Sequence, residues 1–426
     1  MKTRIISMCF AIALVVGIAL PVAGCGGPEQ AETGKGSLKV GMMTPSTGPA
    51  AEKGAAGGAG IMDAARYINE ELGGVDGHPL EVVWRDSAYD MSKVVTIVKE
   101  FKDMGCLLFT THSSAEMAAA QEIANRDGFP GMATYVSPVN YRPPQHIYAP
   151  LPDYADGWIT FAEYYMKSIW KGTGKPKMAL HLLANPTGRG AKDGVMAKAN
   201  ELGIEIVATE EHKATTVSEV ESLTRIKAKN PDVLFIASTP APTAVIIKNA
   251  KELGMWPNIT IGVGHAALTS SLIELGGKDL VEGVYGDYPM VTWDDDVLGI
   301  AKAKEYAQKY NAKYYDTKNV DYLSTWTSTL IVREMLLKAL KAVGYEVLAK
   351  GDAAAWKAVE EQGIQKLNGT TINGLIPSGV SYVAGDNRLS RSFKIFKITN
   401  GDIKAITGWT ESPMVKYEDY DWFAKK

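Results

Sequence analysis

The 426-residue chain has few cysteines and few histidines: three of the first, Cys9, Cys25 and Cys106, and six of the second. Cys9 falls in an apolar N-terminal segment and Cys25 directly follows that segment, so only Cys106 remains in the rest of the chain. One cysteine can form neither a disulfide framework within a mature chain nor a cysteine-ligated zinc site. The histidines are dispersed and form no H-E-x-x-H motif, so a histidine zinc site is not expected either.

The chain also lacks a marked net charge and long apolar runs. Its formal net charge is -3, and its Lys and Arg residues are scattered, which argues against nucleic acid as a partner. After the N-terminal segment, no apolar run reaches the ~20 residues that a transmembrane helix needs. A Walker-type phosphate loop and a G-x-S-x-G nucleophile elbow are missing. These absences favour a binding protein over an enzyme, and we expect no cofactor and no metal.

Residues 1–24 are predicted to be a signal peptide. Lys2 and Arg4 give a positive start, residues 8–20 are apolar, and residues 21–24 form a small-residue cleavage region. The sequence Val-Ala-Gly-Cys at 22–25 resembles the lipobox of bacterial lipoproteins. This resemblance implies that Cys25 carries lipid and that residues 25–36 are the anchor and tether; an ordinary secreted protein with an incidental cysteine is the alternative. The expected location is the periplasmic or extracytoplasmic face of the cell envelope, with lipid as the only membrane attachment.

Residues 105–135 carry the most informative local pattern. The apolar run 107–109 predicts a buried strand, and residues 115–127, closed by Gly128, predict a helix. Between them lies a hydroxyl-rich turn in which Ser113 and Glu116 fit a capping box. A helix N-terminus beyond the carboxyl end of a strand is where α/β sheets bind small anions. Ser113 has a sufficient explanation as a helix cap, so Ser114 is the better ligand-binding candidate.

Strand and helix patterns alternate along most of the chain. Strands are predicted at 38–43, 80–84, 177–183, 204–209, 233–237 and 259–263, and helices at 54–72, 92–104, 158–171, 191–202, 219–229 and 243–253. Helices at 295–310, 320–343 and 353–362 and a strand at 392–398 follow. This order predicts an α/β fold with parallel, doubly wound sheets, and about 400 residues predict two domains.

The motifs, taken in order, resemble those of a known family. They comprise residues 42–54, Gly73-Gly74-x-x-Gly77, Asp86, Ser113-Ser114-Ala115, Pro130 and residues 187–190. Together they resemble type I periplasmic binding proteins of ABC importers, in the branched-chain amino acid-binding branch, over residues 38–409. The resemblance implies two doubly wound lobes joined by three hinge crossings, with lobe 1 at 37–149 and 285–371 and lobe 2 at 150–284 and 372–426. It also implies a monomer that closes on a small solute and delivers it to permease subunits.

The resemblance also implies a set of ligand-binding residues. Ser113 and Ser114 match the turn that receives a ligand carboxylate, and the other positions lining the cleft are Tyr135, Ser137, Thr44, Ser46, Thr47, Asp153, Thr187, Thr239, His265 and Tyr288. Lys53 stands where the family often has an aromatic residue; it either places a charge at the cleft mouth or is simply solvated.

One departure from the family bears on the ligand. His265 stands where the amino acid receptors have an acid that binds the ligand ammonium, and a buried ammonium without a carboxylate is costly. The expected solute is therefore a small carboxylate, either an amino acid held differently or an organic or aromatic acid without an amine. A sensory receptor for amides or other small solutes, and an enzyme on the same fold, are the alternatives.

Overall fold

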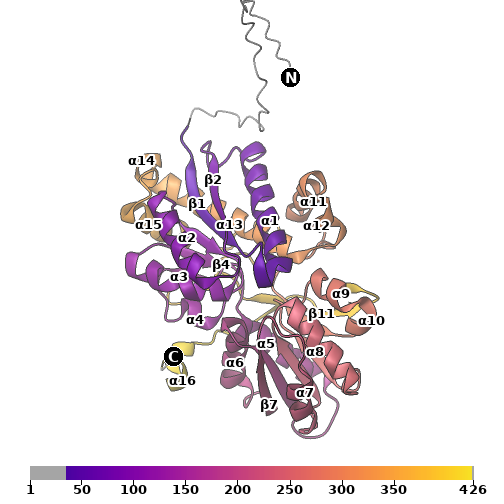
Figure 1. Cartoon of the computed structure of the whole chain (residues 1–426). Coiled ribbons are helices and arrows are strands. Elements are labelled where there is room, and N and C mark those ends of the chain that lie inside the picture. The colour runs from indigo at the N-terminus through magenta and orange to yellow at the C-terminus, as the bar shows by residue number, and fades with distance from the viewer. Residues whose placement is uncertain (1–34, 425–426) are drawn as a thin grey trace, which may run out of the picture.

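The computed structural model describes residues 35–424, which form two α/β lobes (Figure 1). The predicted signal peptide, Cys25 and most of the tether lie outside the described residues. Each lobe has its own sheet, and the chain crosses between the lobes three times. Among residues 35–424, no helix combines the length and hydropathy that crossing a bilayer requires.

Lobe 1 is built on a parallel sheet with the strand order β2-β1-β3-β4-β5. Its strands are β1 (Leu38–Thr44), β2 (Leu80–Asp86), β3 (Phe109–Thr111), β4 (Gly131–Ala133) and β5 (Ile147–Tyr148). Its helices are α1 (Ala51–Glu70), α2 (Met91–Asp103), α3 (Ser114–Asp127), α4 (Pro138–Tyr141), α11 (Leu298–Tyr310), α12 (Ala312–Asp316), α13 (Val320–Val343), α14 (Tyr345–Leu348) and α15 (Ala353–Ala358).

Alternate residues of β1 face opposite helix layers, as the two-residue period of a strand requires. Val40 and Met42 belong to the apolar core that includes α1 and α13, whereas Met43 packs in a separate core with α2 and α3. Glycine is needed at position 41 because Phe101 of α2 packs closely against β1. A Cβ atom on residue 41 would lie 2.3 Å from the Phe101 ring. Both faces of the sheet are therefore covered, which explains its continuous apolar strands.

Lobe 2 is built on a mixed sheet with the order β12-β11-β10-β9-β8-β6-β7. Its strands are β6 (Lys177–Leu183), β7 (Glu205–His212), β8 (Val233–Ala237), β9 (Thr260–Val263), β10 (Tyr285–Tyr288), β11 (Ser392–Thr399), β12 (Asp402–Ala405) and β13 (Thr410–Glu411). Its helices are α5 (Tyr154–Tyr164), α6 (Pro186–Lys198), α7 (Val220–Lys227), α8 (Pro240–Glu252), α9 (Ser270–Gly276), α10 (Lys278–Val281) and α16 (Asp421–Ala424). The α/β doubly wound class is confirmed; β11 and β12 add an antiparallel edge.

Two of the crossings lie side by side. Ala149, after β5, forms a parallel bridge with Arg388 of the returning chain, and its amide donates to the Asn387 carbonyl at 2.9 Å. The middle crossing follows β10, which pairs with β9 and β11 and so belongs to the lobe 2 sheet. The return to lobe 1, expected from residue 285, therefore comes only after Tyr288, because 285–288 completes the second sheet.

Several element boundaries differ from the expected ones, mostly at helix starts. α6 and α8 begin at Pro186 and Pro240, earlier than expected, because proline suits the first helical turn and does not mark a loop there. The strand expected at 107–109 is regular only from Phe109, although the Leu107 amide already donates to the Lys39 carbonyl at 2.9 Å.

Helix α7, expected from residue 219, begins at Val220, and Glu219 is its N-cap without a side-chain hydrogen bond to a backbone amide of the helix. The carboxylate of Glu219 instead accepts hydrogen bonds from Thr216 and Ser222, each at 2.6 Å.

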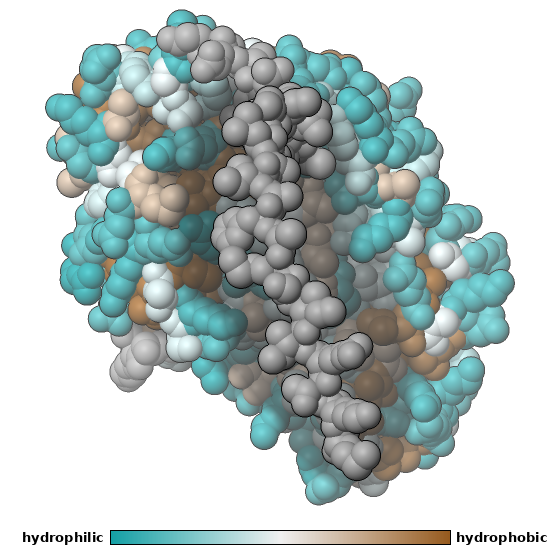
Figure 2. Space-filling view, turned by 45° about the horizontal axis from the view of Figure 1, so that its top comes forward, coloured by the Kyte–Doolittle hydropathy of each residue, from teal (hydrophilic) through white to brown (hydrophobic). Residues whose placement is uncertain are grey.

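The surface in Figure 2 is mostly hydrophilic, with hydrophobic residues in scattered groups. The most exposed large apolar side chains, Val217, Leu298 and Leu275, come from three different segments. Isolated apolar side chains of this kind are normal on a folded protein and need no partner to explain them.

Candidate functional site

The N-terminus of α3 shows how two neighbouring serines differ. The Ser113 hydroxyl accepts the Glu116 amide at 3.2 Å, and the Glu116 carboxylate accepts the Ser113 amide at 2.8 Å, so the capping box is confirmed. Ser114 is fully buried and its hydroxyl lies 3.3 Å from that of Thr187 in lobe 2. Ser113 therefore serves the helix, whereas Ser114 lies where the two lobes meet.

Glu116 is fully buried beneath this turn. Its carboxylate also accepts the His112 amide at 3.1 Å and the Ser87 hydroxyl. Burial raises the pKa of Glu116 to about 7, against the effect of these hydrogen bonds. The charge at the α3 N-terminus therefore depends on pH in the neutral range.

Lobe 1 contributes a buried ion pair that links α1, α13 and the segment after β4. Lys53 of α1 is 4% exposed and its Nζ lies 2.5 Å from Asp321 Oδ1 in the first turn of α13. The Tyr135 hydroxyl donates to the same oxygen at 2.8 Å, and Lys53 Nζ lies 4.4 Å from the centre of the Tyr135 ring. The expectation of a simply solvated Lys53 is wrong, because α13 brings a carboxylate against it.

Lobe 2 contributes a histidine held by a second carboxylate. His265 Nδ1 lies 2.8 Å from Asp287 Oδ2 on β10. The His265 ring stacks on Tyr154 of its own lobe, with ring centres 4.9 Å apart, and on Tyr135 of lobe 1, at 5.8 Å. This stack joins the two charged groups into one set, the interlobe cluster: Lys53, His112, Tyr135, Tyr154, His265, Asp287 and Asp321.

The interlobe cluster leaves several buried polar atoms without a partner among the described residues. These atoms are both ring nitrogens of His112, His265 Nε2, Asp287 Oδ1 and Asp321 Oδ2. His112 Nε2 is 3.8 Å from Asp321 Oδ1, too far for a hydrogen bond, and burial lowers the pKa of His112 to about 4. Buried polar atoms are normally satisfied, so this concentration indicates a place for a polar ligand.

Three other predicted site residues, Tyr288, Ser137 and Thr239, make contacts outside the set that defines the cluster. Tyr288 donates its hydroxyl to the Val320 carbonyl at 3.1 Å, next to Asp321. Ser137 lies against lobe 2, since a Cβ on Gly190 would be 2.6 Å from its hydroxyl oxygen. Thr239 is the N-cap of α8, and its carbonyl accepts the Thr243 hydroxyl at 2.8 Å.

The first-strand loop uses its hydroxyls within lobe 1. Thr44 lies 2.9 Å from the Ser46 hydroxyl and accepts the Trp84 indole N–H at 3.1 Å. Thr47 is exposed and donates to Asp86 at 2.7 Å. These contacts shape the loop that precedes α1.

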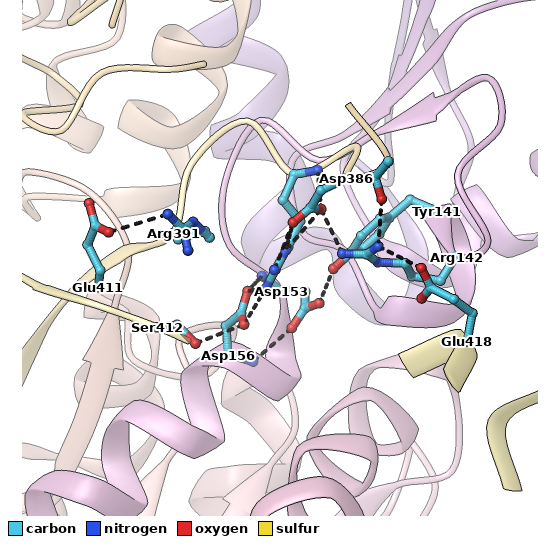
Figure 3. A network of polar contacts seen from close by, with 11 residues as sticks. Tyr141, Arg142, Asp153, Asp156, Asp386, Arg391, Glu411, Ser412 and Glu418 are labelled. Atoms are coloured by element: carbon cyan, nitrogen blue, oxygen red, sulfur yellow. Dashed lines mark hydrogen bonds and ion pairs between the residues drawn. The ribbon is translucent and has the colours of Figure 1, made fainter. Parts of the chain in front are cut away.

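Asp153 belongs to a different set of buried charges, at the hinge (Figure 3). One of its oxygens caps α5 by accepting the Asp156 amide at 2.8 Å, and the other accepts the Tyr141 hydroxyl. Both oxygens are thus engaged outside the interlobe cluster, so the Asp153 carboxylate has a structural role at the hinge.

The rest of this hinge network is centred on Arg388, which is fully buried. Its guanidinium donates to both oxygens of Asp156, at 2.6 and 2.8 Å, and pairs with Asp386 at 2.9 Å. Arg142 pairs with Asp386 at 2.8 Å and with Glu418 at 3.1 Å. As Figure 3 shows, residues from both lobes and from the third crossing converge here.

The two acids of the interlobe cluster escaped the sequence analysis. Asp287 was not predicted because it is 22 residues from His265 in the sequence. The two residues meet only because β10, which carries Asp287, pairs with β9, the strand that leads to His265. Asp321 looked like an acid at a helix start, a position that the helix dipole alone explains. Lobe 2 thus holds a carboxylate beside His265, contributed by β10.

Two more contacts join the lobes outside the cluster. Asn185, the N-cap of α6, donates its side-chain amide to the Tyr89 hydroxyl at 2.9 Å. The Ser271 hydroxyl lies 3.5 Å from the Glu52 carbonyl. Tyr89 has a positive φ of 57°, an uncommon backbone conformation for a tyrosine. The lobes are thus in direct contact on either side of the cluster.

Comparisons with known proteins agree with this architecture. A family model described as "Periplasmic binding protein" matches residues 37–402. No curated protein matches the sequence. Among solved structures, the chain is similar to a branched-chain amino acid ABC transporter protein from Thermus thermophilus with bound valine, at 19% identity and a TM-score of 0.77, covering 91% of this chain and 99% of that one.

Two further structures show the same fold. One is a leucine-binding protein from Thermotoga maritima, at 17% identity and a TM-score of 0.71, covering 88% of this chain and 99% of that one. The other is a fatty acid ABC transporter substrate-binding protein from Thermomonospora curvata, at 20% identity and a TM-score of 0.73, covering 90% and 94%.

Proposed function

Because the chain belongs to the periplasmic binding protein family, we propose that it is the substrate-binding lipoprotein of an ABC importer. It captures a small carboxylate-bearing solute, an amino acid or an organic acid, between its lobes. The single observation that supports this most is the interlobe cluster, in which unpartnered buried polar atoms come from both lobes.

The mechanism follows from where the cluster lies. A solute that contacts both lobes binds better when they are closed, and by linkage it shifts the protein towards the closed form. The hydroxyl oxygens of Ser114 and Thr187 are 3.3 Å apart across the interface. Both hydroxyls would contact one solute oxygen, one from each lobe. Permease subunits would then distinguish the closed form from the open one.

Ser113 and Ser114 give a matched test of this function. The purified chain is screened by thermal unfolding against leucine, valine, 4-methylpentanoate, benzoate and phenylacetate; a solute at 100 times its Kd adds about 2.7 kcal/mol of stability. Ser114→Ala should abolish the shift with little loss of stability. Ser113→Ala should cost about 1 kcal/mol by removing a helix cap but keep the shift. A solute that shifts Ser114→Ala as strongly as wild type contradicts the assigned role of Ser114.

The lipid anchor is tested separately. Cys25→Ala should move the protein from the detergent phase to the aqueous phase in a detergent partitioning assay of expressing bacteria. A wild-type protein already in the aqueous phase contradicts lipidation at Cys25.

A further inference from the structure

Lys53 brings an ammonium group into the interlobe cluster. We propose that Lys53 determines specificity by occupying the cation position at Asp321, so that the bound solute is an acid or amide with no ammonium of its own there. This inference rests on the proposed function and narrows the class of solute.

The position that Lys53 occupies has the features of a cation-binding site. Its Nζ lies 2.5 Å from a carboxylate oxygen of Asp321 and 4.4 Å from the centre of the Tyr135 ring. A carboxylate beside an aromatic face attracts ammonium groups both by charge and by the ring quadrupole. The lysine side chain is 5% exposed, so its charge is removed from water and directed at this pair.

Asp321 is held in place independently of Lys53. Its amide donates to Asn319 at 2.9 Å, and its Oδ1 also accepts the Tyr135 hydroxyl at 2.8 Å. Its position in the first turn of α13 adds the favourable field of a helix N-terminus. A preformed carboxylate that is already paired with a cation of the chain has little to gain from a second one.

The free acceptors around the pair suit neutral donors. Asp321 Oδ2 and Asp287 Oδ1 are unpartnered among the described residues, and an O–H or amide N–H of a solute satisfies either of them. His265, which holds Asp287, stacks on the same Tyr135 ring that Lys53 lies against. A solute ammonium at Asp321 would therefore face the Lys53 charge.

The remaining titratable neighbours do not replace Lys53. Burial raises the pKa of Glu52, which favours its neutral form, and lowers the pKa of His112, which also favours its neutral form. Lys53 is the cationic side chain that the structure places against Asp321, at 2.5 Å.

Chemical rescue tests the cation position without requiring the natural solute. Lys53→Ala leaves Asp321 buried and unpaired, so its unfolding midpoint should fall below that of wild type. n-Propylammonium, which replaces the missing end of the side chain, should raise the midpoint of Lys53→Ala saturably, and 1-propanol should not. Wild type should respond to neither. Equal responses of wild type and variant to n-propylammonium, or no response of a folded variant, overturn the proposal.

Lys394→Ala is the matched control. Lys394 Nζ pairs with Asp295 at 2.9 Å and lies 4.7 Å from the centre of the Trp409 ring, outside the cluster. Its pair is more exposed, so rescue by n-propylammonium is not expected. If Lys53→Ala does not fold, the double variant Lys53→Ala/Asp321→Asn removes both charges together and keeps the space for n-propylammonium. That variant should fold and ignore n-propylammonium; a saturable rise of its unfolding midpoint with n-propylammonium overturns the proposal.

Matched solutes test the class of ligand. Wild type should bind 4-methylpentanoate and 3-phenylpropanoate at least about tenfold more tightly than leucine and phenylalanine, their α-amino counterparts, because like charges meet at Lys53. Lys53→Ala should lose or reverse this preference. Tighter binding of the amino acids to wild type overturns the inference while leaving the proposed function intact. If neither pair binds, the proposed function loses support for these solutes, and the rescue result still decides the role of Lys53.

Discussion

Arg388 of the hinge network and the two acids of the interlobe cluster are all buried and charged, yet their hydrogen-bonding groups are satisfied to different degrees. Arg388 uses its fork of donors on Asp156 and Asp386, and Asp156 also accepts the Ser412 hydroxyl at 2.8 Å. Asp321 and Asp287, by contrast, each keep one oxygen without a partner among the described residues. A buried charge that is fully paired holds the structure together, and one that is partly paired is available to a ligand.

The type of cationic side chain also differs between the two regions: arginine at the hinge and lysine in the interlobe cluster. Arginine presents a rigid planar fork that can satisfy two carboxylates, which suits a hinge where three segments must keep their relative positions. Lysine presents a compact charge on a flexible chain, which suits a site that must accommodate a solute. The contrast can be tested by perturbing each region separately.

The largest expected effect is at the hinge. Arg388→Met leaves Asp156 buried without a cation and Asp386 paired with Arg142 alone, and removing one partner of a buried pair costs about 3–5 kcal/mol. Urea unfolding of wild type and variant measures this loss. Arg391→Met is the control: its pair with Glu411 is exposed and 3.4 Å long, so a change of at most about 1 kcal/mol is expected. A loss of similar size in both variants would remove the distinction between the hinge network and surface pairs.

A pH effect of intermediate size is expected at Glu116. Its folded pKa of about 7 exceeds its ordinary value of 4.5, so between these values the folded protein binds more protons than the unfolded chain. Stability from this group is complete below about pH 4.5 and is lost as the pH rises through 7, by roughly 3 kcal/mol.

The measurement is the free energy of unfolding of wild type and Glu116→Gln at several pH values from 4.5 to 7.5. Wild type should lose stability relative to the variant as the pH rises, because glutamine does not titrate. Parallel curves would show that Glu116 is ionised throughout, stabilised by its backbone donors.

The smallest expected effect concerns the contact between the lobes. Tyr89→Phe removes the hydrogen bond between Asn185 of lobe 2 and residue 89 of lobe 1, which forms when the lobes close. Its loss should destabilise the closed form by about 0.5–1.5 kcal/mol. The closed fraction should fall, which small-angle scattering would detect as a larger radius of gyration of the ligand-free protein. Tyr310→Phe, on the outer side of lobe 1, should leave the radius unchanged. An unchanged radius in Tyr89→Phe would show that this hydrogen bond does not maintain closure.

Elements with strong local signals were predicted well. The helix at 320–343 agrees with α13 at both ends. The Ser113–Glu116 capping box begins α3 and the αL residue Gly128 ends it, both as expected. Boundaries at Pro186 and Pro240 were missed because proline is favoured both in loops and in first helical turns. The expected site set included Tyr135 and His265 but lacked Asp287 and Asp321.

The sequence by itself determined the alternation of strands and helices, the apolar faces of the strands and the caps that begin the helices, because each depends on residues within a few positions of one another. Only the tertiary structure decided which buried charges meet. Lys53 and Asp321 are 268 residues apart, and Arg388 and Asp156 are 232 apart. Their pairing depends on strand order and on the second and third crossings of the hinge, which carry α13 back to α1 and Arg388 back to α5. The role of a buried charge depends on the group it pairs with, and here the tertiary fold determines which residue that is.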